Sequence, residues 1–499
     1  MCLGKRRPEP CRAVAAALGI ATVLALQIVA VPGLLGQAGG GGAAGADAGG
    51  GAAGPGAGAA ASGAHGAAPA AQSAAATGAN AAQPGQGAAA AYAAGASLGP
   101  DPRKPPQSRP GALTLPQVVE LARAKNPTVL AAEQNLRGVR AQEIQAGVRT
   151  NPYFTLYGTN VTLPAAGASN PYAYSAQVSR LFERGEKRRW RLEDTRAISG
   201  QTQAQLEDSI RQTVLAVKQA FTRMLIAKDA LELSSASLKD FRHEVEISLE
   251  RYKAGDLGKL DYERLDLQLG NLESDESTNT VALRQASDQL QTLIGIETPT
   301  PEFDVAGDII PPVIAQTEAM LVQEGLAKRP DYTATRFAVA AAEANARLAV
   351  ANSTTDPTLE GEYDRRGRYD SAGFSINVPL RIFDRNQGNR ETTRLQIDAT
   401  RLTQVAARNQ VISDVDQAWV GYTLAKRLSD RFGEHYLDES GDVLSIAQFA
   451  FEHGGIALID YLDALREARA STSYALNAYL QTWQAIHQLS AASATELTP

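Results

Sequence analysis

Two short stretches of the 499-residue chain place an aspartate six residues after a glycine. They are "RYKAGDLGKLDYERL" (251–265) and "FEHGGIALIDYLDAL" (451–465). Their aspartates are Asp261 and Asp460, and the second stretch adds Asp463. Residues three apart lie on one face of a helix, so Asp460 and Asp463 would present two neighbouring carboxylates.

These carboxylates can act through their negative charge. Grouped acids attract cations, but an aspartate in the first turn of a helix also caps that helix and meets the positive end of its dipole. Catalytic motifs are missing: the Gly runs before residue 60 have no following Lys-Ser/Thr, and the chain has no nucleophile elbow and no His pair at i,i+4. We therefore expect neither an enzyme nor a cofactor.

The first hundred residues have the composition of targeting and linker sequence. Basic residues precede an apolar run from Ala13 to about Leu35, and small residues follow it. That order is typical of a secretory signal peptide, which we assign to 1–38; a membrane anchor is the alternative. Residues 39–100 are almost all Gly and Ala. Such sequence cannot bury enough apolar surface to offset its ordering entropy, so we expect a disordered linker over 39–110.

The positions of the cysteines and the net charge exclude some kinds of site and give no support to others. Cys2 and Cys11 both precede the apolar run, so signal cleavage would leave a mature chain without cysteine. Disulfides and thiolate metal sites are then excluded. The net charge is −6, with both signs mixed along the chain, which gives no support to nucleic-acid binding.

The ordered part of the chain contains an internal repeat of about 200 residues. "ARAKNP" (122–127) matches "LAKRP" (326–330), with the prolines 203 residues apart, and the two glycine phrases are 199 residues apart. In each copy a helix of about 20–25 residues precedes two alternating segments, a very long helical stretch, the glycine phrase and another long helix. The expected units are a first repeat (111–300), a linker (301–316), a second repeat (317–492) and a tail (493–499).

Four segments alternate between apolar and polar residues. They are 153–163, 173–179, 359–365 and 372–380. This period of two predicts strands with one apolar and one solvated face. In the first segment the expected apolar face carries Tyr153, Tyr157, Val161 and Leu163. Either a small sheet packs on helices, or a membrane barrel turns its apolar face to lipid. A sheet this small has no evident second layer to pack against, which favours the barrel.

The intervening helices are unusually long. From Val214 to Tyr252 the apolar residues keep a 3,4 heptad spacing, which predicts coiled-coil packing. The positions that break the spacing are Lys228, Ser235 and Arg242. No proline lies between Gly185 and Gly255, and about 70 helical residues would span roughly 100 Å. The sequence thus predicts a rod of antiparallel helices, with strand hairpins at one end and the glycine phrases as turns at the other.

Together these features resemble the TolC-type outer-membrane factor (outer membrane efflux protein) family over about residues 113–492. The most specific segments are "RLFERGEKRRWRLEDTRA" (180–197) and "VPLRIFDRNQGNRE" (378–391). The second is similar to the branch that serves heavy-metal and cation efflux, with Arg381 replacing a usual second proline. The resemblance implies a mainly α fold with a small β part: long coiled-coil helices and four membrane strands per subunit, in a homotrimer with one barrel of about twelve strands and a helical tunnel.

Physical reasoning accords with a trimer. Four strands cannot close a barrel, and an open sheet edge in lipid would leave backbone groups unpaired. Closure by symmetry removes that edge. The hairpin loops at 164–172 and 366–370 would then face outside the cell.

The resemblance also implies a function. The chain would be a passive exit duct in the outer membrane of a Gram-negative-type bacterium, in contact with lipid and with a long periplasmic extension. Its partners would be a periplasmic adaptor (membrane fusion protein) and an inner-membrane RND-type or related transporter. Cation or heavy-metal efflux leads over drug efflux and type I protein secretion. Outside the channel class, a periplasmic coiled-coil scaffold or adaptor remains, but a scaffold needs no strands with apolar outer faces. A conduit needs no chelating metal site, and none is expected.

The inner tips would carry the gate. Asp460 and Asp463 match two acids of the family's second tip, which a trimer would repeat as two stacked rings preferring cations. Asp261 matches a latch acid, but its usual Arg and Tyr partners fall here on Ile456 and Phe451. That latch is therefore absent, and closure must rest on other contacts. Helix capping alone remains the alternative role for these acids.

The turns themselves would dock the adaptor's helical hairpin. The docking residues expected from the resemblance are Ala254, Gly255, Asp256, Leu257, His453, Gly454 and Gly455. Glycine at these positions is also what any turn between two helices favours.

Overall fold

The computed structural model describes residues 101–159 and 172–497. The expected signal peptide, most of the expected linker, residues 160–171 of the first hairpin loop and the last two residues lie outside this range. Val161 and Leu163, expected on the first apolar face, are among them. None of the described helices has an apolar stretch long enough to span a membrane.

The order of elements repeats, as predicted. The first copy contains α1 (Leu115–Lys125), α2 (Pro127–Gly147), β1 (Tyr153–Thr159), β2 (Ala173–Leu181), α3 (Lys187–Ala254) and α4 (Lys259–Ile294). The second contains α5 (Glu318–Lys328), α6 (Pro330–Ala351), β3 (Thr358–Arg366), β4 (Tyr369–Asn377), α7 (Gln387–Asp430), the π-helix η1 (Arg431–Tyr436), α8 (Leu437–Glu452) and α9 (Leu458–Ser493).

The matched prolines begin equivalent helices. Pro127 and Pro330 each occupy the first turn of their helix, where proline's missing N–H costs nothing. Before Pro127, the side chain of Asn126 accepts hydrogen bonds from the backbone N–H groups of Thr128 (2.9 Å) and Val129 (3.2 Å). This cap fixes the corner between α1 and α2.

The long helices are confirmed. α3 is a single helix of 68 residues, about 100 Å at about 1.5 Å per residue. Its heptad positions Val217, Phe221 and Met224 are buried. Lys228, which breaks the heptad spacing, is also mostly buried, and its Nζ lies 2.6 Å from Asp304 Oδ1. The second copy differs because a π-helical turn separates α7 from α8.

The strands form one antiparallel sheet in the order β1-β2-β3-β4. Aligned neighbours such as Phe154–Val178 and Gly361–Phe374 define its apolar face. Phe374 on that face is 85% exposed, and none of the described helices covers it. β1 and β4 are the two edges of the sheet.

Two details of the predicted strands are wrong. On β1 the apolar face is made by Phe154 and Leu156, whereas Tyr153 and Tyr157 lie on the polar face, where Tyr157 Oη donates to Glu362 Oε1 (2.5 Å). Both alternations of this strand look apolar, and its register with β2 aligns Phe154 with Val178 and Leu156 with Ala176. The second loop is also shorter than the predicted 366–370: Gly367, with φ +60°, allows a two-residue turn.

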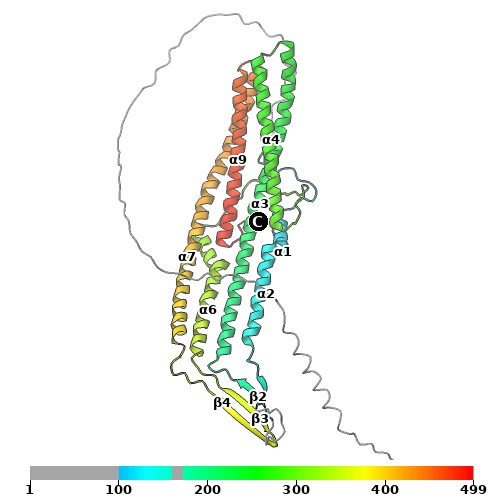
Figure 1. Ribbon diagram of the computed structural model, residues 1–499. Helices are drawn as coiled ribbons and strands as arrows, with labels where there is room; N and C mark the ends of the chain where they lie inside the picture. The colour runs from blue at the N-terminus through cyan, green and yellow to red at the C-terminus, as the bar shows by residue number, and fades with distance from the viewer. Residues whose placement is uncertain (1–100, 160–171, 498–499) are drawn as a thin grey trace, which may run out of the picture. The chain divides into compact units, whose positions relative to one another are not determined.

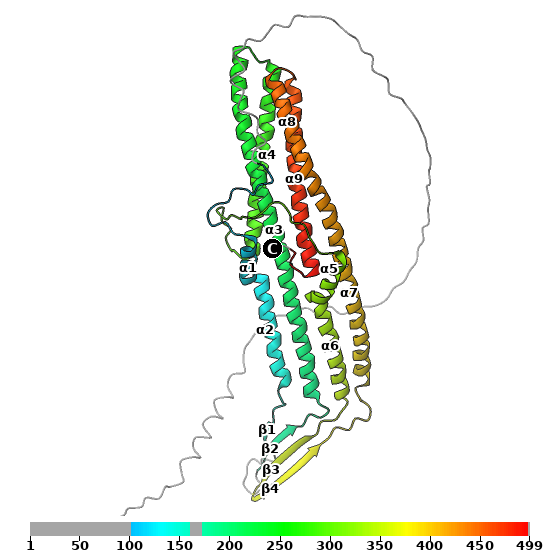
Figure 2. The same ribbon diagram turned by 180° about the vertical axis from the view of Figure 1, so that it is seen from behind.

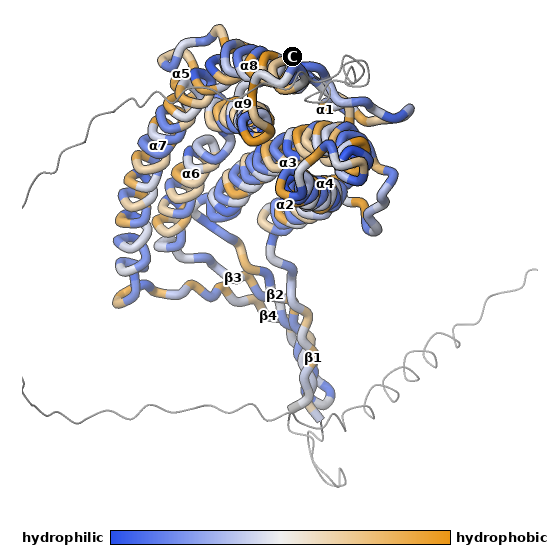
Figure 3. Tube along the Cα trace, turned by 90° about the horizontal axis from the view of Figure 1, so that it is seen from above, coloured by the Kyte–Doolittle hydropathy of each residue, from blue (hydrophilic) through white to orange (hydrophobic). Residues whose placement is uncertain are grey.

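The helices form a curved layer (Figures 1 and 2). Next to the strands its order is α2, α3, α6 and α7; farther away it is α4, α3, α9 and α8. Figure 3, viewed along the helices, shows the strands projecting from one side of this layer. The layer therefore has two side edges, one made by α2 and α4 and the other by α7 and α8.

Residues 101–110, which composition placed in the linker, lie against this layer. The backbone N–H of Gln107 donates to Glu232 Oε2 of α3 (3.0 Å), and Lys228 Nζ donates to Ser108 Oγ (3.2 Å). Arg103 Nη1 lies 2.9 Å from Asp438 Oδ1 of α8. This segment therefore links the first repeat to the second.

Candidate functional site at the helix-hairpin tips

Both glycine phrases are turns between long helices, as predicted. At the first, Gly255 has φ +85°, and Asp256 N–H donates to the carbonyl of Arg251 (2.9 Å). At the second, Gly454 has φ +74°, and Gly455 N–H donates to the carbonyl of Ala450 (2.6 Å). The left-handed backbone favours glycine at both positions. Figure 1 shows both turns at the end of the layer away from the strands.

The expected docking residues surround these turns. Ala254 ends α3, and Asp256 and Leu257 bridge to α4. His453 follows α8, and its Nδ1 lies 2.8 Å from the carbonyl oxygen of Phe449. Leu257 packs against the neighbouring apolar cluster, while Asp256 and His453 are exposed. The tips therefore combine an anchored backbone with polar side chains at the surface.

Two of the three expected gate acids, Asp261 and Asp460, stand at equivalent places in the first turns of α4 and α9, and Asp463 lies three residues farther along α9. Asp460 Oδ2 accepts a hydrogen bond from the N–H of Ala457 (3.3 Å), which caps α9. Asp463 accepts from Arg466 Nη1 (2.6 Å), and Asp261 lies 3.5 Å from Arg264 Nη1. Asp460 and Asp463 are exposed. The capping alternative is thus realised for Asp460, and its position leaves the carboxylate accessible.

The positions expected for the missing latch partners belong to an apolar cluster between the hairpins. Ile456 and Phe451 pack against buried residues of α3, α4 and α9. The buried members include Leu238, Phe241, Val245, Leu265, Leu458, Tyr461, Leu462 and Leu465. The two hairpins are therefore held together close to their tips mainly by apolar packing.

An aromatic pair closes each turn, at the same spacing in both copies. Tyr252 stacks on Tyr262 with ring centroids 5.3 Å apart, and Phe451 stacks on Tyr461 at 5.2 Å; both pairs are 7° from parallel. Each pair joins the end of one helix to the start of the next. The sequence patterns did not lead us to these pairs, although an aromatic residue precedes each glycine and a tyrosine follows each aspartate.

Tyr461 also reaches the other hairpin. Its side chain is fully buried, and its Oη donates to Glu244 Oε2 of α3 at 3.4 Å. Farther from the tips, Arg469 Nη2 of α9 lies 3.7 Å from Asp275 Oδ2 of α4. These two contacts are polar links between the hairpins, in the region where the sequence left closure unassigned.

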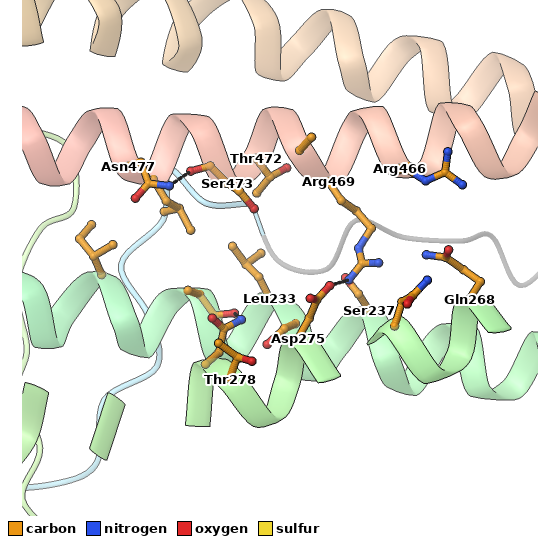
Figure 4. Close-up of a pocket in the computed structure, with 17 residues that line it drawn as sticks. Leu233, Ser237, Gln268, Asp275, Thr278, Arg466, Arg469, Thr472, Ser473 and Asn477 are labelled. Atoms are coloured by element: carbon orange, nitrogen blue, oxygen red, sulfur yellow. Dashed lines mark hydrogen bonds and ion pairs between the residues drawn. The ribbon is translucent and has the colours of Figure 1, made fainter. Parts of the chain in front are cut away.

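The second link crosses a polar cavity of about 550 Å³ between α3, α4 and α9. Figure 4 shows Arg469 extending from α9 toward Asp275, with Gln268 and Thr278 on the same side as Asp275. Burial lowers the pKa of Arg469, and the charge of Asp275 opposes that shift. Within the described part of the chain, no three His, Cys, Asp or Glu side chains are grouped to hold a metal ion.

Comparison with known proteins identifies a family and a relative of this chain. The family model described as "Outer membrane efflux protein" matches residues 118–296 and 321–495, which fall in the two repeats. The chain is 25% identical over 385 residues to "Cobalt-zinc-cadmium resistance protein CzcC" of Cupriavidus metallidurans, covering 76% of this chain and 90% of that protein.

Solved structures share the fold. A membrane protein from Pseudomonas aeruginosa superposes with a TM-score of 0.66 at 18% identity, covering 76% of this chain and 92% of its own. CusC gives 0.64 at 18% identity, over 80% and 100%. The open state of the MtrE outer membrane channel of Neisseria gonorrhoeae also gives 0.64 at 18%, over 83% and 95%. The chain, with its two matched repeats and this fold, belongs to the outer membrane efflux protein family.

Proposed function

We propose that this chain is the outer-membrane exit duct of a tripartite efflux system and that its cargo is a heavy-metal or similar cation. Family membership supports an outer-membrane duct. Similarity over most of the chain to a protein named for cobalt, zinc and cadmium resistance favours metal cations. The duct would be passive, joined to a periplasmic adaptor and an RND-type inner-membrane transporter.

The observation that carries the proposal is the uncovered sheet. Its apolar face is exposed at Phe154, Phe374 and Ile376, while its other face carries Glu360, Glu362 and other polar residues. Such a division suits a barrel wall between lipid and water. The sheet ends in two edge strands, which lipid would leave without hydrogen-bond partners.

A homotrimer would satisfy both edges. Pairing β4 of one subunit with β1 of the next would give a barrel of about twelve strands without a free edge. The two side edges of the helical layer also carry exposed apolar residues that could pack against each other in a trimer. Exposed apolar residues recur on α4 at Leu260, Leu267 and Val281, and on α7 and α8 at Val420, Leu424, Leu428, Ile446 and Phe449. We assign these two stripes to contacts between neighbouring subunits.

The tips would form the periplasmic gate. Threefold repetition would place Asp460 and Asp463 in two rings at the constriction, where exposed carboxylates favour cations. The six turns of a trimer would dock the adaptor. The Tyr461–Glu244 and Arg469–Asp275 links would hold the hairpins together in the resting state.

Ion selectivity in planar bilayers tests the proposal. The purified trimer is expected to conduct, with a reversal potential in a salt gradient that shows preference for cations. Replacing both ring acids (Asp460→Asn with Asp463→Asn) should move the reversal potential toward zero. Asp266→Asn, which changes an exposed acid of α4 outside the turn, is the control and should leave it unchanged.

Two results would count against parts of this assignment. A trimer that never conducts, even when Glu244→Gln loosens the inter-hairpin link, would point to the coiled-coil scaffold instead. Conductance whose cation preference survives the double Asp→Asn change would keep the duct and remove the ring role of these acids.

A further inference from the structure

The π-helical turn between α7 and α8 approaches α9 closely. Gly433 lies in η1 against Tyr479 of α9, and a Cβ at residue 433 would overlap the Tyr479 ring. The turn exposes the carbonyl of Tyr436 to α9, where Ser471 Oγ donates to it (3.3 Å). π-helical turns of this kind are frequent at functional sites, because the added residue reorients neighbouring side chains.

Side chains of η1 and α9 form an aromatic cluster. The Phe432 ring lies 5.3 Å from the Tyr436 ring and 5.8 Å from that of Tyr474 on α9, tilted by 49° and 45°. The three rings line a hollow of about 430 Å³ between α8 and α9. This size falls within the range of about 300–1,000 Å³ usual for small-molecule sites.

The charged residues that line the hollow are both acidic. Glu439 lies 3.3 Å from His435 Nε2, a partner that is charged only when protonated. Glu467 on α9 is exposed, and within 172–497 no ion pair engages it. Aromatic ring faces carry partial negative charge, so rings and carboxylates act in the same direction. Both attract a positive group.

The structure already contains one such contact at the margin of this cluster. The Arg431 guanidinium carbon lies 5.2 Å from the centre of the Tyr436 ring, and Nη2 donates to Tyr436 Oη (2.7 Å). Arg431 does not line the hollow itself. Tyr436 thus engages one cation from outside, while Phe432 and Tyr474 remain available inside.

We propose that the hollow bounded by Phe432, Tyr436, Tyr474, Glu439 and Glu467 binds an organic cation, an ammonium group carried on an apolar body. A bare metal ion does not suit it, since the carboxylates are not grouped with further ligands. An anion would be repelled by both glutamates. The apolar lining from Val443, Ala464 and Ala468 would take the uncharged part of the ligand. This site does not depend on the proposed duct, because binding is measured without transport.

The test uses the full-length protein purified in detergent and benzyltrimethylammonium as the probe, measured by saturation-transfer NMR and calorimetry. We expect saturable binding that is much weaker for benzyl alcohol, which has the ring but no charge. Glu439→Gln with Glu467→Gln, and separately Phe432→Leu with Tyr474→Leu, should each weaken binding by about tenfold, as expected for losing a charge or a cation–π contact.

The matched control changes an acid on α8 outside the hollow. Asp442→Asn should leave the affinity unchanged, because its side chain is exposed and does not line the site. Equal binding of the uncharged probe would overturn the proposal. So would unchanged affinity in the Glu→Gln variant, whose surface substitutions preserve the fold, or an equal loss in the control.

Discussion

The hydroxyl of Tyr461 on α9 lies 3.4 Å from a carboxylate oxygen of Glu244 on α3. The two residues are 217 positions apart and belong to different repeats. Around this contact, the Tyr461 ring stacks on Phe451 and is enclosed by apolar residues from both hairpins. One side chain therefore closes its own turn and joins the two hairpins.

Tyr461→Phe separates these two roles. The ring remains, but the hydroxyl that meets Glu244 is lost. We expect a loss of about 1 kcal/mol in stability, the usual net contribution of a hydrogen bond, together with a larger resting conductance. Thermal unfolding and bilayer recordings measure the two effects. Tyr262→Phe, the equivalent change in the first hairpin, is the control; an equal rise in conductance there would show that the Glu244 contact is not the cause.

Gly433→Ala tests the close approach of the π-helical turn to α9. The added methyl group would meet the Tyr479 ring, and such overpacking typically costs about 1–3 kcal/mol. Gly441→Ala on α8 is the matched control, because a Cβ there has open space and should raise stability by up to about 1 kcal/mol. Circular dichroism during heating compares them. Gly433→Ala combined with Tyr479→Leu should recover stability; failure to recover it would contradict the assigned clash.

Asp229 makes stability depend on pH. Burial in α3 raises its pKa to about 7, and the charges of Glu232 and Asp101 add to the shift. The native state then keeps a proton that the unfolded chain releases near its ordinary pKa of 3.8. This favours folding fully below pH 3.8, and the advantage is lost as pH rises through about 7.

Asp229→Asn should remove that dependence. The variant is expected to melt at a higher temperature than the unchanged protein at pH 8, because no charge must be buried there. At pH 5, where the native Asp229 keeps its proton but the unfolded chain has released it, the difference in melting temperature should be smaller than at pH 8. Melting curves at both values measure the difference. The same difference at pH 5 and pH 8 would show that Asp229 does not titrate in this interval.

Asp304→Ala tests the ion pair of Lys228, the residue that breaks the heptad spacing of α3. Burial alone would raise the pKa of Asp304, but hydrogen bonds from Lys228 and from the N–H of Arg109 outweigh it and hold the pKa below its ordinary value. Without Asp304, Lys228 keeps a buried charge with only neutral partners. We expect a loss of about 3–5 kcal/mol, measured by denaturant unfolding. Lys228→Met with Asp304→Ala should regain much of it.

The sequence predicted the features that depend on local periodicity. The absence of proline between Gly185 and Gly255 predicted the length of α3, heptad spacing predicted its packing, and a glycine followed by an aspartate marked both tips. The helix predictions succeed because residues three and four apart in sequence lie on one face of a helix. Alternation located the strands, but it could not choose between the two faces of β1, since Tyr153, Phe154, Leu156 and Tyr157 supply apolar area to both.

The features that the sequence did not predict depend on distant residues. The π-helical turn brings Gly433 against Tyr479 on the opposite helix, and a glycine within a helix gives no hint of that partner. The Tyr461–Glu244 link likewise requires two repeats to be placed side by side. Lys228 was noted only as an interruption, because its partner Asp304 lies beyond the end of α4.

The stacked rings at the two tips have a consequence for association. Tyr252 with Tyr262, and Phe451 with Tyr461, fix each turn within a single subunit. A helix that approaches these ends meets backbone that is already rigid, so little conformational entropy is lost on contact. Docking of a partner helix at these ends, as proposed for the adaptor, would therefore need little rearrangement of the two turns.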